Sequence, residues 1–163
     1  MNSSIIKKKD IEKTNASRLS DIINEELGLI TVSDFGGGEG IQMQGLDSQY
    51  TLILIDNQPI IGRSAGTLDL DRISVGNIKQ VEIVRGASSS LYGNEALAGV
   101  INIITDEPKS GFNGSLSSSY ETHNTLDNNI SLSYRNKNFK STFFINRYSS
   151  DGYDLNQNDE LNT

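Results

Sequence analysis

The stretch from Val81 to Thr105, VEIVRGASSSLYGNEALAGVINIIT, restricts the possible fold more than any other part of the chain. It places two aliphatic, β-branched runs, VEIV and GVINIIT, on either side of a segment made almost wholly of Gly, Ala and Ser. β-Branched residues favour strands, whereas glycine lets the backbone turn sharply and approach other segments closely. The pattern therefore predicts two strands joined by a hinge rich in small residues, which also carries the large side chains of Leu91 and Tyr92.

The remainder of the chain up to Thr105 mixes helix and short strands. Apolar residues at helical spacing predict a helix over residues 15–27, with Asn15 or Ser17 as its cap, Gly28 just past its end, and a buried face of Leu19, Ile22, Ile23 and Leu27. Strands are predicted over 29–33, 41–44 and 50–55, the last followed by a hairpin turn at Asp56, Asn57 and Gln58. The runs FGGGEG (35–40) and GRSAGT (62–67) are predicted loops. We therefore expect an α+β fold for this part.

The residues after Glu107 and Pro108 have a different pattern. Three segments of about ten residues alternate apolar with polar side chains, and the short run RNKN separates the second from the third. The apolar positions are Phe112, Leu116, Tyr120, Ile130, Leu132, Tyr134, Phe139, Phe143 and Ile145. This alternation is typical of outer-membrane β-barrel strands, and equally of the half-solvated antiparallel sheets of soluble proteins.

Composition excludes several classes of function. The formal net charge of −7 argues against nucleic acid as a partner. The chain has no cysteine and a single histidine, His123, so disulfides and thiolate or histidine-rich metal sites are excluded. The N-terminus lacks the apolar region of a secretory signal, and no segment approaches the roughly 20 apolar residues of a membrane-spanning helix.

Nucleotide, calcium and hydrolase sites all lack a required residue. Gly40 and Gly45 have phosphate-loop spacing without the lysine that must follow, and the glycine cluster before them contains no GxGxxG. A hydrolase would need one of Ser88, Ser89 and Ser90 with His123 as its base, but GASSS is not GxSxG. The acidic residues Asp151, Asp154, Asp159 and Glu160 lack the spacing of a calcium loop. We therefore expect no enzymatic activity.

Two long segments together resemble the plug domain of TonB-dependent outer-membrane receptors. The first is Ile41–Ile60, IQMQGLDSQYTLILIDNQPI, and the second is Val81–Thr105, in which VEIVRG, SLYG and AGVINIIT match the family pattern in its usual order. The resemblance implies a plug domain over residues 1–107 and the first strands of a 22-stranded outer-membrane β-barrel over 108–163. It also explains the small-residue hinge, because a plug must fit inside a closed barrel.

The resemblance further implies a function, partners and site residues. Such receptors bind and import a scarce nutrient, of the iron–siderophore, haem or cobalamin type, while their barrel faces outer-membrane lipid. The energy comes from the partner protein TonB, so the resemblance implies no bound cofactor. Two plug loops contact the ligand in this family, and they match Phe35, Gly36, Gly37, Gly38, Glu39, Gly62, Arg63 and Ser64 of this sequence. Arg85 matches a plug arginine that contacts the barrel, whereas Gln44 stands where the family usually has a second such arginine.

Three interpretations stay open at this point. The signal peptide, the TonB box and most barrel strands of the family are not in the sequence, so we expect a piece of a longer receptor. A free-standing soluble plug-like ligand-binding module without transport is the alternative, and a hydrolase using His123 is the third possibility. Bare apolar faces on the C-terminal strands would favour the barrel, whereas covered faces would favour the soluble module.

Overall fold

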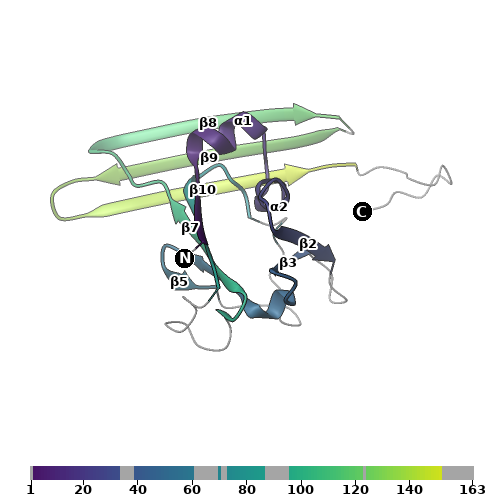
Figure 1. Cartoon of the computed structure of the whole chain (residues 1–163). Coiled ribbons are helices and arrows are strands. Elements are labelled where there is room, and N and C mark those ends of the chain that lie inside the picture. The colour runs from purple at the N-terminus through teal and green to yellow at the C-terminus, as the bar shows by residue number, and fades with distance from the viewer. Residues whose placement is uncertain are drawn as a thin grey trace. The chain divides into compact units, whose positions relative to one another are not determined.

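The computed structural model describes residues 2–33, 39–60, 70, 73–86, 96–122 and 124–151. The chain divides into two compact units, Met1–Asp106 and Glu107–Thr163 (Figure 1). Part of the hinge between the two motif strands, residues 87–95, lies outside the described residues.

A five-stranded sheet forms the centre of the first unit, with strand order β1-β6-β7-β4-β5. Its strands are β1 (Asn2–Lys7), β6 (Ile78–Arg85), β7 (Gly99–Thr105), β4 (Thr51–Ile55) and β5 (Gln58–Pro59). β4 and β7 run parallel, and the other neighbours are antiparallel. β2 (Leu29–Ser33) and β3 (Glu39–Met43) form a separate antiparallel pair. The helices are α1 (Lys8–Thr14), α2 (Leu19–Asn24) and the 3₁₀ helix η1 (Ser48–Tyr50). This mixed sheet with short helices confirms the predicted α+β fold.

Side-chain alternation along β4 and β7 distributes apolar residues to both faces of the sheet. Ile53, Ile101 and Ile103 belong to the main core, which also contains residues of both helices. Leu52, Leu54 and Val100 point to the other face and pack with Ala96. Because side chains alternate with a period of two, a strand that is apolar at every position is buried on both faces, as the runs TLILI and GVINIIT require.

The predicted helix is shorter than its apolar pattern suggested. Arg18 has an extended backbone conformation and is the N-cap of α2, and its backbone N–H donates to the Asp21 carboxylate at 2.9 Å. The expected cap at Asn15 or Ser17 is therefore wrong. Asn15 instead ends α1 in a left-handed conformation with φ 53°. Leu27 lies beyond the helix and is 90% exposed, which contradicts its predicted burial.

The strand predictions hold, with small changes at their ends. β2 and β7 have the predicted bounds, whereas Tyr50 belongs to η1, and Glu39 and Gly40 belong to β3 rather than to a loop. The predicted hairpin is formed by Asp56 and Asn57, both at positive φ (48° and 66°). β1 and α1 were not predicted.

The second unit is a three-stranded antiparallel sheet of order β10-β9-β8. Its strands are β8 (Gly111–Glu121), β9 (Thr125–Arg135) and β10 (Lys140–Ser149), which confirms the three predicted strands. The RNKN turn is closed by the Asn136 N–H, which donates to the Phe139 carbonyl at 2.9 Å. The Asn136 side chain accepts from the backbone N–H groups of Asn138 and Phe139 at 2.9 and 2.8 Å.

Candidate functional site

Arg85, the last residue of β6, connects three segments of the first unit. One of its Nη atoms donates to Oε1 of Glu26 and to the Leu27 carbonyl, both at 3.0 Å, and the other donates to Oγ of Ser4 at 3.3 Å. The side chains of Arg85 and Glu26 are only 14% and 25% exposed. A shielded pair of this kind depends on both partners, because removing one leaves a poorly solvated charge. Its Nε is buried and has no hydrogen-bond partner among the described residues.

Glu26 and Leu27, two of the three partners of Arg85, lie in the turn that follows α2, and Ser4 lies on β1. The Glu26 N–H donates to the Ile23 carbonyl at 3.1 Å, and Gly28 completes the turn at φ 81°. The turn thereby presents the Glu26 carboxylate and the Leu27 carbonyl to Arg85. Sequence reasoning missed Glu26, because the helix was expected to continue through it and because 59 positions separate it from Arg85.

Gln44, the second residue expected to contact the barrel, lies in a tight turn. Gln44 and Gly45 have φ of 55° and 76°, and the Leu46 N–H donates to the Met43 carbonyl at 3.0 Å. The Gln44 side chain is exposed. Met43 pairs with Leu29, so this turn lies at the same end of the β2–β3 pair as the Glu26–Leu27 turn. The structure thus brings the Gln44 turn to the end of the β2–β3 pair that also supplies two partners of Arg85.

Most of the predicted ligand contacts fall outside the described residues. These are Phe35, Gly36, Gly37, Gly38, Gly62, Arg63 and Ser64, and the same holds for Ser88, Ser89, Ser90 and His123, which were considered for a hydrolase. Glu39 is described at the start of β3, where its backbone pairs with Ser33. Ser33 and Glu39 thus lie at the end of the β2–β3 pair opposite the Gln44 turn.

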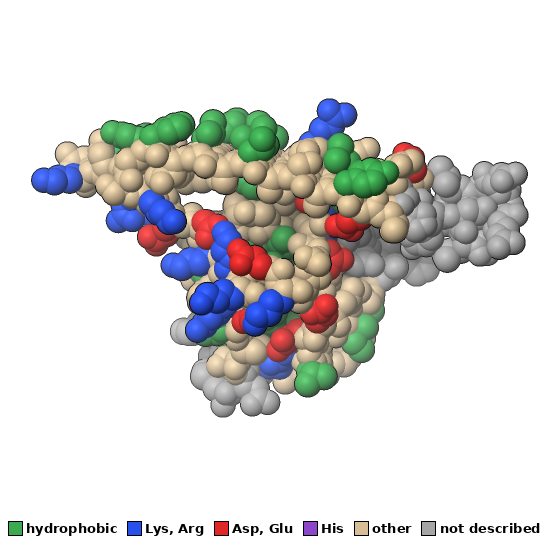
Figure 2. Space-filling model, turned by 90° about the horizontal axis from the view of Figure 1, so that it is seen from above, with side chains coloured by type: hydrophobic (Ala, Val, Ile, Leu, Met, Phe, Trp, Pro, Cys, Tyr) green, Lys and Arg blue, Asp and Glu red, His purple; other side chains and the backbone are tan. Residues whose placement is uncertain are grey.

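The sheet of the second unit has one apolar face, made of cross-strand rows. Phe112 pairs with Tyr134, Leu116 with Ile130, and Ile130 in turn with Ile145; Leu132 pairs with Phe143 and Tyr120 with Leu126. All of these side chains are exposed, the largest fractions being 76% for Leu116, 72% for Phe112 and 70% for Tyr120. Figure 2 shows apolar side chains in green gathered along the top of the view, with a blue basic side chain among them. Aromatic residues stand toward both ends of the face.

The opposite face of this sheet is mostly polar, with Phe144 and Tyr148 as its aromatic residues, and hydrogen bonds cross its strands. Asn146 on β10 donates from Nδ2 to the carboxylate of Asp127 and, at 2.9 Å, to the side-chain oxygen of Asn129, both on β9. Asp127 is 4% exposed. Serines and an asparagine of β8 have the same parity, namely Asn113, Ser115, Ser117 and Ser119. The two faces therefore suit different surroundings, one apolar and the other aqueous or protein-lined.

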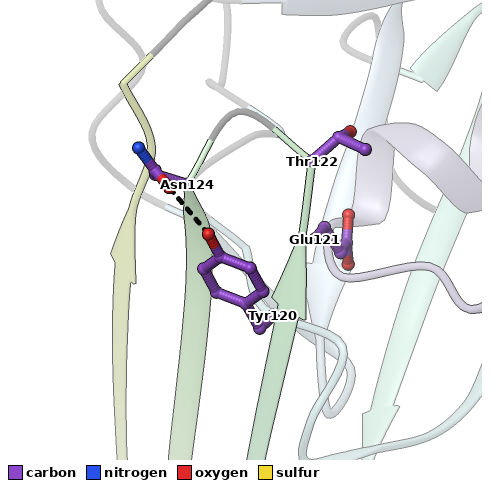
Figure 3. Close-up of a pocket in the computed structure, with 4 residues that line it drawn as sticks. All are labelled: Tyr120, Glu121, Thr122 and Asn124. Carbon is purple, nitrogen blue, oxygen red and sulfur yellow. Dashed lines mark hydrogen bonds between the residues drawn. The ribbon is translucent and has the colours of Figure 1, made fainter.

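An open hollow of about 710 Å³ lies at the turn between β8 and β9 (Figure 3). It is lined by Tyr120, Glu121, Thr122 and Asn124. The Tyr120 hydroxyl donates to Oδ1 of Asn124 at 2.6 Å, and Nδ2 of Asn124 donates to Asp151 at 2.7 Å. Ligand sites are usually enclosed and lined by apolar groups with a few polar ones. This recess is too open for that, and its hydrogen bonds serve to order the strand ends.

Three further ion pairs occur among the described residues. Lys8 pairs with Asp106, and Arg135 with Glu107 at 3.6 Å. Lys13 donates to Asp10 at 3.0 Å, and this hydrogen bond and the charge of Lys13 lower the pKa of the Asp10 carboxyl. A carboxyl group whose pKa is lowered in the folded state stabilises the fold at pH values above its ordinary pKa. This stabilisation is lost as the pH falls, and it is small here because both side chains are exposed. Within the described ranges, no three His, Cys, Asp or Glu side chains are grouped to hold a metal ion.

Comparison with known families assigns the first unit. Residues 1–100 match the family described as "TonB-dependent Receptor Plug Domain". The chain belongs to this family. The match includes β6, the Gln44 turn and Arg85, and it ends at residue 100, within β7. In the part of this plug-family protein that the structure describes, no helix has the length and apolar character needed to cross a membrane.

Similar proteins extend the relationship to the second unit. The vitamin B12 transporter BtuB of Vibrio vulnificus is 38% identical over 109 residues, which are 65% of this chain and 18% of that protein. The siderophore receptor PirA of Acinetobacter baumannii shares the fold, with a TM-score of 0.77 and 23% identity over 98% of this chain and 26% of its own. A variant of the ferric enterobactin receptor PfeA of Pseudomonas aeruginosa gives a TM-score of 0.76 and 27% identity over 97% of this chain and 26% of its own. The chain therefore spans about a quarter or less of these proteins' lengths.

Proposed function

We propose that this chain forms the plug and the first barrel strands of an outer-membrane receptor that imports a scarce nutrient with energy from TonB. The observation that carries the proposal is the bare apolar face of β8, β9 and β10 in a chain whose first unit is a plug. Leu116 and Phe112 at its centre and end are 76% and 72% exposed. Water is a poor solvent for such a face, whereas lipid chains match it.

The alternative, a soluble plug-like module without transport, requires this face to be covered. Each exposed aliphatic or aromatic side chain would gain about 1.5–3 kcal/mol on burial, so a soluble protein has a strong reason to cover them. An antiparallel sheet with polar residues on one face and bare apolar residues on the other instead fits a barrel wall between lipid and an aqueous or plug-filled lumen. We therefore favour the receptor.

The relatives and the sequence of the plug loops support a proposal about the ligand class. The similar proteins include a vitamin B12 transporter, a siderophore receptor and a ferric enterobactin receptor. We propose a ligand of this size and type, a cobalamin, haem or iron chelate, in contact with the loops that contain Phe35 and Arg63. Glycine-rich loops offer backbone N–H groups with little steric bulk, and Phe35 and Arg63 add stacking and charge. No enzymatic step and no resident cofactor are part of this proposal.

Uptake by cells tests the function directly. Cells that express the gene carrying this sequence are expected to accumulate radiolabelled cyanocobalamin or ferric enterobactin, and to lose that uptake when TonB is deleted. Arg63→Ala is expected to reduce the affinity for an anionic chelate several-fold, because one charge-assisted contact is lost. Uptake that is unchanged without TonB would contradict energy coupling, and absence of uptake for every chelate tested would contradict the receptor.

Arg85 and Gln44 are the proposed contacts of the plug with the barrel. The turns at one end of the β2–β3 pair hold Gln44 and two partners of Arg85, so both residues suit a single docking region. Arg85 is already paired with Glu26, and we propose that the part of its side chain that stays exposed contacts the barrel. Gln44 supplies a neutral amide, which donates hydrogen bonds without the added strength of a charge.

The membrane-facing side of the sheet has its own test. Ile130→Arg is expected to destabilise the inserted protein by about 3 kcal/mol, because a charge on the lipid face of a barrel strand costs about 2–4 kcal/mol at mid-membrane. Ser131→Arg, at the next residue of the strand, is the matched control on the opposite, mostly polar face, where charges are tolerated. The amount of protein in the outer-membrane fraction measures both. Equal losses for the two variants would show that this face does not contact lipid.

A further inference from the structure

One cation interrupts the apolar face of the second unit. Arg147 on β10 pairs with Asn128 on β9, and Asn128 pairs with Ser118 on β8. These three residues form a polar row across all three strands. Strand parity places the row on the face that carries Leu116, Ile130 and Ile145, not on the face of Asp127 and Asn146.

The polar row lies between two apolar rows near one end of the sheet. Leu116, Ile130 and Ile145 form the row on one side, and Tyr120 and Leu126 lie on the other. Neighbouring rows on one face are about 7 Å apart, because two residues of a strand separate them. Tyr120 and Leu126 flank the β8–β9 turn, so Arg147 lies about one row in from the strand ends. That position corresponds to the edge of the apolar band rather than to its middle.

Arg147 has no carboxylate partner within the described ranges. Arg85 pairs with Glu26 and Arg135 with Glu107, whereas Arg147 makes no ion pair or side-chain hydrogen bond with the residues that the structure describes, and its side chain is exposed. An arginine without a partner on a lipid-facing surface is costly unless an anion meets it. Acidic groups are abundant in a chain of net charge −7, yet the residues that face Arg147 across the sheet are apolar or neutral.

We propose that Arg147, Asn128 and Ser118 bind the phosphate of a membrane lipid whose acyl chains lie along Leu116, Ile130 and Ile145. This inference rests on the proposed membrane location of the sheet. The guanidinium presents a fork of N–H donors that matches two phosphate oxygens, and the Asn amide and Ser hydroxyl add neutral donors in the same row. The apolar row on the inner side is positioned for the acyl chains, and the Tyr120 row for the headgroup region.

Vesicle binding by the 163-residue chain tests this site. Arg147→Gln and Lys140→Gln each remove one positive charge, but Lys140 begins β10 on the opposite face. Affinities are measured by co-sedimentation with phosphatidylcholine vesicles, with and without phosphatidylglycerol. We expect R147Q to bind the anionic vesicles about fivefold more weakly than K140Q, and the two to bind neutral vesicles with closely similar affinity.

Each outcome decides between specific explanations. Equal binding of the two variants to anionic vesicles would overturn the phosphate site and leave the membrane face intact. Absence of binding of the unmodified chain to either kind of vesicle would overturn the membrane location and the site with it. Loss of the R147Q effect in millimolar inorganic phosphate would show that the row takes free phosphate rather than a lipid headgroup.

Discussion

Replacing Gly99 with alanine is expected to destabilise the plug unit by about 3 kcal/mol, at the upper end of the usual cost of overpacking. A Cβ at Gly99 would collide with the backbone carbonyl oxygen of Val84 and with the Met43 side chain. Methionine can change rotamer, but the carbonyl cannot move freely, because Arg85 pairs with Gly99 and Val84 with Val100 in the same ladder. Hydrogen exchange of the β7 amides measures the loss, since protection there reports the stability of the central strand.

Gly86→Ala is the control for Gly99→Ala. Gly86 has φ +87°, and a Cβ there would have open space around it. Its substitution therefore carries only the conformational cost of a left-handed alanine, about 1 kcal/mol. If both variants accelerated exchange of β7 equally, close packing of β7 against β6 and Met43 would not be the reason for glycine in the AGVINIIT motif.

Arg85→Met is expected to cost about 3 kcal/mol, because it leaves the Glu26 carboxylate without its partner in a shielded position. Methionine keeps much of the length of the arginine stem and removes the charge and all three hydrogen bonds. The free energy of unfolding by urea, followed by circular dichroism, measures the change. Glu26→Gln in the Arg85→Met background is expected to recover part of the loss, since a neutral amide tolerates the site better than an unpaired charge.

Lys13→Met removes the cation of an exposed pair and serves as the control for Arg85→Met. The side chains of Lys13 and Asp10 are 75% and 54% exposed, so water and salt screen their interaction and no measurable change in unfolding is expected. A loss for Lys13→Met as large as that for Arg85→Met would mean that burial does not distinguish the two ion pairs. The Arg85–Glu26 pair would then have no special part in holding the plug unit together.

Local patterns were sufficient for most strands and insufficient for the helices. The runs LITVS and GVINIIT became strands with the predicted bounds, because a period of two and β-branched composition act within each segment. The helix over 15–27 was too long, because Arg18 is extended and the chain turns at Glu25–Gly28 to bring Glu26 to Arg85. β1 and α1 were missed, since NSSIIK and KKDIEKT carry no strong periodic signal and gain their order from β6 and from burial of Ile11.

The sequence by itself determined the family, through two ordered motifs, and the two-faced character of the last three strands, through simple alternation. Only the tertiary structure decided which segments meet. It placed β7 parallel to β4 and antiparallel to β6, gave Glu26 to Arg85, and aligned Ser118, Asn128 and Arg147 in one row. The physical reason is that periodicity is a property of neighbouring residues. Pairing and register depend instead on contacts between distant segments, where a shift of one residue would move every side chain to the other face.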